Sequence, residues 1–203
     1  MENNAKVNVK NDSGNTVLFY AVSKSSCNEE IVKLLVEAGA DINSQNIVGE
    51  SIFRRLVVNG NEKLIEYFLE QKGLKINIVN KSGRTPLSYV LDELLNVFFS
   101  NKSNKNWLNI KNLLLKHNAK LGDNKHDNNL LINAVKEKSL RKIKTYIECG
   151  INVNSIDSES SLSALQLAIK NGQKDIANAL IEAGANKEKL TESEKQFLNS
   201  ITV

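Results

Sequence analysis

Apolar residues recur at helical spacing in five stretches of this chain, and most of these stretches stop at a Gly and a short tail that ends in Asn. The clearest copy is residues 31–43, IVKLLVEAGADIN, and residues 176–186, IANALIEAGAN, repeat it near the other end. Gly adopts the left-handed conformation that ends many helices without steric cost, and Asn does so at little cost. The pattern therefore predicts five amphipathic helices that end in the same way. The three weaker copies are residues 64–77, 110–122 and 142–154.

A shorter apolar helix is expected before each of these five helices. A turn comes first, and a Ser, Thr or Asn then stands where its side-chain oxygen can accept a hydrogen bond from the first turn of a helix. A period of about 34 residues indicates stacked repeats, each of which needs its neighbours to bury its apolar face. The expected capping residues are Thr16, Ser51, Thr85, Asn129 and Ser163, which are 35, 34, 44 and 34 residues apart.

The sequence thus predicts an all-α solenoid of about five helix-turn-helix units in a single domain over residues 1–203. The expected units are residues 12–45, 46–79, 80–123, 124–157 and 158–187. A last helix is expected at residues 191–201, because Thr191 and Glu194 have the spacing of a capping box. This helix would cover the exposed face of the fifth unit with Phe197, Leu198 and Ile201.

The residues of these units resemble the ankyrin repeat over roughly residues 5 to 186. Thr85, Pro86 and Leu87 are similar to the start of the family's first helix, and residues 39–43, GADIN, are similar to the end of its second. The resemblance implies that turn tips and first helices line a concave groove that binds a protein partner. One departure is the first-helix His of the family, whose places are held here by Phe19, Arg54, Ser88, Ile132 and Gln166.

The third unit is about ten residues longer than the others. The insertion lies at residues 91–107, where an apolar stripe continues to Phe99 and a polar loop then leads to Trp107. The first helix of this unit is therefore expected to run on by about two turns. The extension either packs on its own repeat or projects to contact a partner. Trp107, the only Trp, is either a core residue or an interface anchor.

Composition and charge exclude several classes of protein. Hydrophobic residues make up 41% of the chain, which is too many for a disordered protein. The net charge of +4 comes from 27 basic and 23 acidic residues that are interleaved, so no nucleic-acid partner is expected. No apolar stretch is long enough to span a membrane, and residues 1–10 show no signal peptide. Cys27 and Cys149 have no metal-ligand spacing, so a cytoplasmic protein with free thiols is expected.

No constellation of residues in the sequence indicates catalysis, a cofactor or a metal. His117 and His126 have no Cys or acidic ligand at a suitable spacing. The motifs GxSxG, GxxxxGK[ST] and GxGxxG are absent. The chain is therefore expected to be a non-enzyme that binds no cofactor.

The expected partner-binding residues lie mainly on the turn tips. Ile47 and Val48 are two adjacent β-branched residues on a tip, and they either pack on the neighbouring turn or form the apolar centre of a binding patch. Basic residues on the following tips would suit a partner with an acidic, partly apolar face. The full candidate set is Ile47, Val48, Glu50, Lys81, Arg84, Trp107, Lys125 and His126.

These features together predict a monomeric module for protein–protein interaction. An adaptor, an inhibitor or immunity-type protein, and an effector that acts in a host cell would all have such a sequence. A second hypothesis comes from the start of the sequence in the middle of a unit. On that hypothesis the chain is the targeting or regulatory part of a larger enzyme.

Overall fold

The computed structural model describes residues 6–23, 27–95, 106–122 and 124–200, and within these ranges its regular elements are all α-helices. The chain divides into two compact units, Met1–Ala119 and Lys120–Val203. Backbone pairing of the extended type is limited, in the described residues, to isolated bridges between Gln45 and Ser51 and between Ile156 and Ser163. The expected all-α class is thus confirmed, whereas the expected single domain and its repeat boundaries stay predictions.

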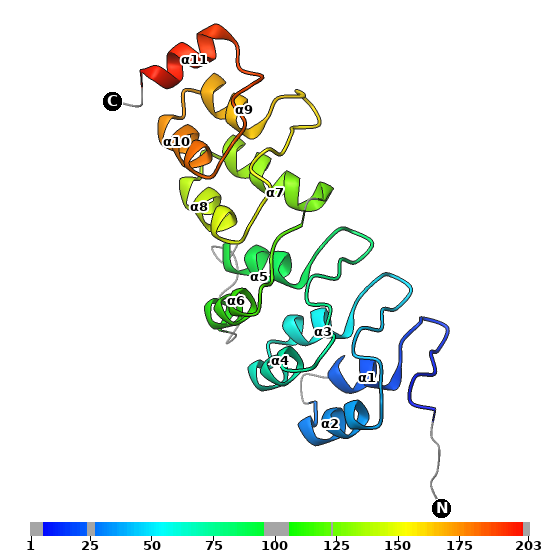
Figure 1. Ribbon diagram of the computed structural model, residues 1–203. Helices are drawn as coiled ribbons and strands as arrows, with labels where there is room; N and C mark the ends of the chain where they lie inside the picture. The colour runs from blue at the N-terminus through cyan, green and yellow to red at the C-terminus, as the bar shows by residue number, and fades with distance from the viewer. Residues whose placement is uncertain (1–5, 24–26, 96–105, 123, 201–203) are drawn as a thin grey trace, which may run out of the picture. The chain divides into compact units, whose positions relative to one another are not determined.

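The first unit contains three helix pairs, which Figure 1 shows in blue to green. The first helix of each pair packs against the first helix of the next, so that α1 contacts α3 and α3 contacts α5. The apolar side chains between them form a continuous core that includes Phe53, Phe68 and Leu91, all of which are fully buried or nearly so. The pairs are α1 (Val17–Ser23) with α2 (Glu29–Glu37), α3 (Ile52–Asn59) with α4 (Glu62–Leu69), and α5 (Pro86–Leu95) with α6 (Trp107–Lys116).

The second unit contains two further helix pairs and a terminal helix. Helix α9 lies between α7 on one side and α11 on the other. The last helix, α11 (Glu192–Asn199), begins at the expected capping box, in which Thr191 and Glu194 bond to each other's backbone N–H. The pairs are α7 (Lys125–Lys136) with α8 (Leu140–Glu148), and α9 (Ala164–Lys170) with α10 (Lys174–Glu182).

Most of the expected helix starts and stops are confirmed. The Ser51 side chain accepts a bond from the N–H of Arg54, and Ser163 forms a full capping box with Gln166. The expected stops all have positive φ, including the non-glycine Asn118 at 61°. These local signals depend on a few neighbouring residues, which is why the sequence shows them clearly.

The expected start of the first helix in the fourth unit is wrong. Helix α7 begins at Lys125 instead of Leu130, and its cap is Asn124 instead of Asn129. The fully buried carboxylate of Asp127 accepts bonds from the N–H of Gly122 at 2.7 Å and from the Asn124 side chain at 2.8 Å. These bonds bring Gly122, Asn124 and Asp127 together at the start of α7, so the turn expected at Lys125 and His126 does not form there.

The enlargement of the third repeat is partly visible. Helices α5 and α6 have 10 residues each, compared with 8 each in α3 and α4. The expected continuation of α5 to Phe99 and the loop that follows it lie outside the described residues, except for Asn106, which caps α6. In the part of the chain that the structure covers, no helix combines the length and apolar character needed to cross a bilayer.

Candidate partner-binding surface

Three turns of the first unit are built on the same plan. In the middle one, Oδ1 of Asn46 accepts hydrogen bonds from the N–H groups of Val48 at 3.1 Å and Glu50 at 3.0 Å. Asn11 and Asn80 make the same pair of bonds in their own turns. An Asn oxygen that binds two backbone N–H groups of its own turn fixes the backbone there. The three turn tips are therefore rigid before any partner binds.

The backbone also joins each of these turns to the next. The N–H of Ile47 donates to the carbonyl of Ser13 at 3.1 Å, and the N–H of Lys81 donates to the carbonyl of Val48 at 3.2 Å. This close approach requires a glycine, because a Cβ on Gly49 would lie 2.8 Å from the Lys81 nitrogen. Turns 11–15, 46–50 and 80–84 thus form one connected surface, which we call the tip row.

A second series of bonds, which was not predicted from the sequence, links the helix ends. Oδ1 of Asn43 accepts from the N–H of Lys75 at 2.8 Å, and its Nδ2 donates to the carbonyl of Gly73 at 2.9 Å. Asn8 binds Asp41 and Gly39 in the same way. The signal was present in the sequence, since an Asn ends most of the tails. Its meaning depends on the next repeat, which a single tail does not show.

The apolar centre of the tip row is exposed. Ile47 and Val48 have 58% and 56% of their surface accessible, although Cγ2 of Ile47 lies against Gly14 of the preceding turn. Ile47 therefore packs only partly on the neighbouring turn, and both side chains remain accessible to a partner. Lys81 on the next tip is also exposed. The structure brings together five of the candidate residues here: Ile47, Val48, Glu50, Lys81 and Arg84.

Two of these five residues are already engaged in ion pairs with helix residues. Glu50 pairs with Arg54, whose side chain is only 9% exposed, and Arg84 pairs with Asp92 at 3.3 Å. The Arg84 side chain remains 38% exposed. Consequently the tip row presents three features to a partner: the aliphatic pair Ile47 and Val48, the Lys81 ammonium, and the exposed part of the Arg84 side chain.

A cluster of aromatic residues is connected to the tip row through Arg54, which pairs with Glu50. The Arg54 guanidinium lies 5.2 Å from the centre of the Tyr89 ring, and Tyr89 packs edge-on against Trp107 with ring centres 5.9 Å apart. Burial raises the pKa of the Tyr89 hydroxyl, the Glu93 carboxylate raises it further, and Arg54 opposes this shift. Tyr89 therefore stays neutral at physiological pH. No local pattern in the sequence indicates this cluster, because its members come from three different helices.

Trp107 is a core residue. It is 5% exposed, so the alternative in which it serves as an exposed interface anchor is wrong. Its indole ring, at the start of α6, fills the space beside Tyr89 on α5. Burial of a large aromatic against another ring is a stabilising contact within the third repeat.

Lys125 and His126 do not belong to the tip row. Both lie in the first turn of α7, in the second unit, and not on a turn tip. Lys125 is exposed, whereas His126 is half-buried. Their expected position assumed a turn in the fourth repeat that the Asn124–Asp127 contacts replace.

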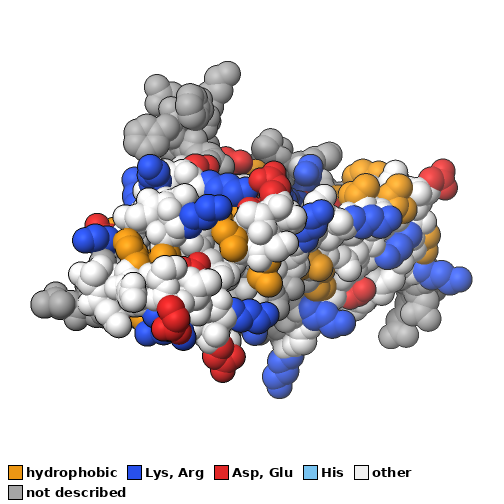
Figure 2. Space-filling view, turned by 90° about the horizontal axis from the view of Figure 1, so that it is seen from above, with side chains coloured by type: hydrophobic (Ala, Val, Ile, Leu, Met, Phe, Trp, Pro, Cys, Tyr) orange, Lys and Arg blue, Asp and Glu red, His pale blue; other side chains and the backbone are white. Residues whose placement is uncertain are grey.

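Among the described residues, no group of three or more His, Cys, Asp or Glu side chains could hold a metal ion. Figure 2 shows that, on the face drawn there, Lys and Arg side chains are spread among acidic and uncharged ones. In the first unit, the candidate partner-binding surface is formed by the tip row and the adjoining first helices.

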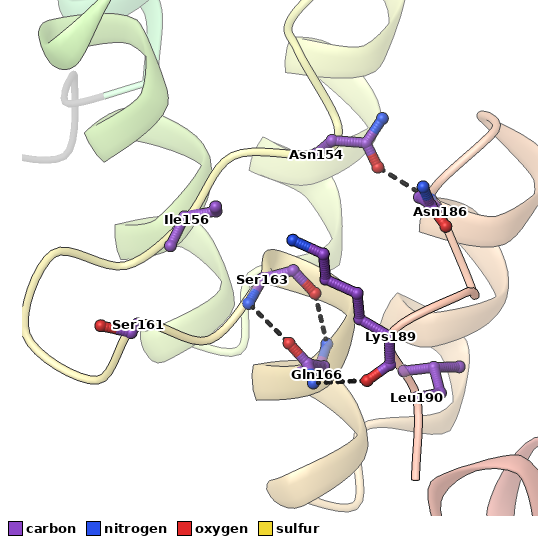
Figure 3. Close-up of a pocket in the computed structure, with 8 residues that line it drawn as sticks. All are labelled: Asn154, Ile156, Ser161, Ser163, Gln166, Asn186, Lys189 and Leu190. Carbon is purple, nitrogen blue, oxygen red and sulfur yellow. Dashed lines mark hydrogen bonds between the residues drawn. The ribbon is translucent and has the colours of Figure 1, made fainter.

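The second unit contains a separate pocket of about 300 Å³. As Figure 3 shows, the turn that carries Ile156 and Ser161 forms one side, and the segment with Lys189 and Leu190 forms another. Gln166 lies at its base, where its side chain binds the Ser163 N–H at 3.1 Å and the Lys189 carbonyl at 3.3 Å.

Comparisons with known proteins point to one family. The family model described as Ankyrin repeat matches residues 13–47 and 161–191, which include the first and the last helix pairs. Rabankyrin-5 of Mus musculus is 28% identical over 182 residues, which are 88% of this chain and 14% of that protein. The p105 subunit of nuclear factor NF-kappa-B of Gallus gallus is 22% identical over 87% of this chain and 17% of its own length.

A shorter relative comes from a bacterium. A putative ankyrin repeat protein of Rickettsia bellii is 36% identical over 63 residues, which are 31% of this chain and 36% of that protein. The chain spans about one seventh of the length of Rabankyrin-5. These relatives share the repeat and differ widely in total length.

Proposed function

Since the chain belongs to the ankyrin-repeat family, we propose that it is a non-enzymatic module that binds a protein partner through its turn tips and first helices. Ankyrin repeats generally mediate protein–protein interaction. The observation that carries the proposal for this chain is the tip row. There, two aliphatic side chains are more than half exposed on a turn whose backbone is fixed by hydrogen bonds on both sides.

Rigidity is the physical reason why this surface suits recognition. A partner that docks on the tip row orders little of it, because the Asn-based turns and the links between them already fix the backbone. The entropy lost on binding is correspondingly small. Exposed aliphatic residues supply the apolar contact that drives association.

The charges around Ile47 and Val48 define the partner further. Lys81 and the exposed part of Arg84 lie on one side of the aliphatic pair, and Glu50 is neutralised by Arg54. The surface therefore complements a partner with an acidic, partly apolar face. Such a module would serve as an adaptor, an inhibitor or immunity-type protein, or a host-directed effector in the cytoplasm, and as a monomer.

A second candidate follows from the lengths of the relatives. Because Rabankyrin-5 and the p105 subunit are several times longer than this chain, the same surface would also suit the targeting or regulatory part of a larger protein, including an enzyme.

The test is a quantitative pull-down with a matched control. The variant Ile47→Glu/Lys81→Glu removes the apolar centre and reverses the adjacent charge, while it leaves the Arg84–Asp92 pair in place. The control Ile156→Glu/Lys174→Glu makes the same changes at an aliphatic residue with 57% exposure and at an exposed lysine of the second unit.

We expect the tip-row variant to lose partners that wild type and control both retain. Equal capture by all three proteins would rule out the tip row as the binding surface.

A further inference from the structure

The first helix pair presents an apolar face that the described residues leave uncovered. Val17, Tyr20, Ile31 and Leu34 are between 48% and 62% exposed. Between α1 and α2 this face is hollowed into a groove of about 330 Å³, whose walls include Val17, Tyr20 and Ile31. We call this surface the first-pair face.

The second helix pair shows what normally covers such a face. Counted from the caps, Ile52 occupies the position of Val17, and Leu64 occupies the position of Ile31. Both Ile52 and Leu64 are 0% exposed, because the first pair lies against the second. The chemistry that fits the first-pair face is therefore the outer side of another helix pair of the same kind.

In the second unit, helix α11 occupies the place of such a neighbour. Helix α11 packs on α9 as α9 itself packs on α7, so it stands where the first helix of a sixth pair would lie. Helix α11 packs on the fifth pair through a small buried surface, since Leu198 is the single buried residue among its described residues. The segment that leads to it adds Leu190, which lies between the pocket of Figure 3 and a second cavity of about 300 Å³ beneath α11.

We propose that α11 is a removable cap, and that the fifth helix pair, once uncovered, binds the first-pair face of a second copy of this chain. The contact repeats the packing that already joins successive pairs within each unit. It is a head-to-tail contact, so it leaves one free end at each step and adds further copies instead of closing into a dimer.

The charges near the two faces favour this order over a symmetric pair. Glu30 is exposed on α2 beside Ile31 and Leu34, whereas Lys33 and Glu37 of the same helix lie near Tyr67 of the second pair. Lys187 and Lys189 are exposed next to the fifth pair, with the exposed Glu188 between them, so this segment has a net positive charge. Head-to-tail docking brings the Glu30 carboxylate towards this segment, whereas two first-pair faces docked together would bring two Glu30 carboxylates towards each other.

The experiment undocks α11 in the full-length chain. Leu198→Asp places a charge at the buried contact of α11, and Gln196→Asp makes a charged change at an exposed position of the same helix. Mass is measured by light scattering after size-exclusion chromatography at several concentrations. We expect wild type and Gln196→Asp to be monomers and Leu198→Asp to shift to dimers and larger species as the concentration rises.

A second substitution separates specific docking from aggregation. Adding Leu34→Glu to Leu198→Asp should restore the monomer, because it charges the first-pair face. Adding Ile47→Glu, at an equally exposed aliphatic residue outside that face, should not. The proposal is overturned if Leu198→Asp stays monomeric, or if Leu34→Glu and Ile47→Glu have the same effect.

Circular dichroism shows whether the fifth pair itself survives Leu198→Asp. If more helix is lost than the eight residues of α11, the variant Thr191→Ala/Glu194→Ala replaces it. That variant weakens the helix at its capping box without altering the core, and the same masses are expected from it. A monomer at all concentrations would again overturn the proposal.

Discussion

Replacing Gly49 by another residue would strain its backbone and crowd the next turn, whereas replacing Gly39 would only strain its backbone. Both residues have positive φ, 76° and 85°, which a residue with a Cβ adopts at a cost of about 1–2 kcal/mol. A Cβ on Gly49 would also meet the Lys81 nitrogen at 2.8 Å, while nothing lies within 4 Å of a Cβ on Gly39. Gly39→Ala should therefore cost about 1–2 kcal/mol of unfolding free energy, and Gly49→Ala about 2–4 kcal/mol.

Urea denaturation of the two variants beside wild type measures this difference directly. The comparison isolates the packing between successive turns, because the conformational cost is shared. Equal losses of stability in the two variants would mean that the turns do not approach as closely as the Ile47–Ser13 and Lys81–Val48 bonds require.

Single residues divide into those the sequence can assign and those it cannot. The position of Ile47 and Val48 on a turn tip could be predicted, whereas the degree of their exposure depends on the neighbouring turn, against which Cγ2 of Ile47 lies. The burial of Trp107 and Arg54 could not be settled, because both depend on Tyr89, which lies on another helix. A contact between helices has no local signature in either partner.

At the scale of the helices, prediction succeeds where the signal is a cap and fails where a buried polar group replaces it. Ser51, Ser163 and Thr191 each lie next to the helix they start. The fourth repeat instead starts from Asp127, whose carboxylate holds Gly122 and Asn124. An Asp at that distance from a helix start looks like a solvated residue in the sequence, so the start of α7 was placed five residues too late.

The turn before α9 gives a prediction about pH. Asp157 accepts bonds from the hydroxyl of Ser160 at 2.7 Å and from the Lys136 ammonium at 3.0 Å. The Ser160 hydroxyl lowers the pKa of the Asp157 carboxyl below its usual value, and Lys136 lowers it further against the opposing effect of burial. A carboxyl whose pKa is lower in the folded state stabilises the fold above its unfolded pKa, and this contribution is lost as the pH falls through the folded value.

Asp157→Asn should therefore be less stable than wild type at pH 7, and the gap between the two should narrow below about pH 4. Thermal melts followed by circular dichroism across this pH range would measure the gap, with Ser160→Ala as a second variant that removes the hydroxyl donor alone. A gap of the same size at both ends of the range would show that the carboxylate does not hold this turn.

At the scale of the whole chain, the period of the repeat predicts the fold better than it predicts the surface. Five helix pairs follow from spacing alone, since each pair needs only its neighbours for burial. The candidate surface depended on every repeat having a turn, so it extended from Ile47 to His126. The tip row that the structure describes is shorter, with turns at residues 11–15, 46–50 and 80–84 of the first unit.

Each compact unit has its own buried core, which predicts that damage to one core stays in that unit. Leu131 is fully buried in α7, so Leu131→Ala should destabilise the second unit by about 2–5 kcal/mol. Hydrogen exchange followed by mass spectrometry should show faster exchange in the helices of the second unit. Peptides from α1, α3 and α5 should exchange as in wild type, because a repeat protein opens first where its local stability is lowest. Equal acceleration in both units would instead show that the chain unfolds as a single cooperative body.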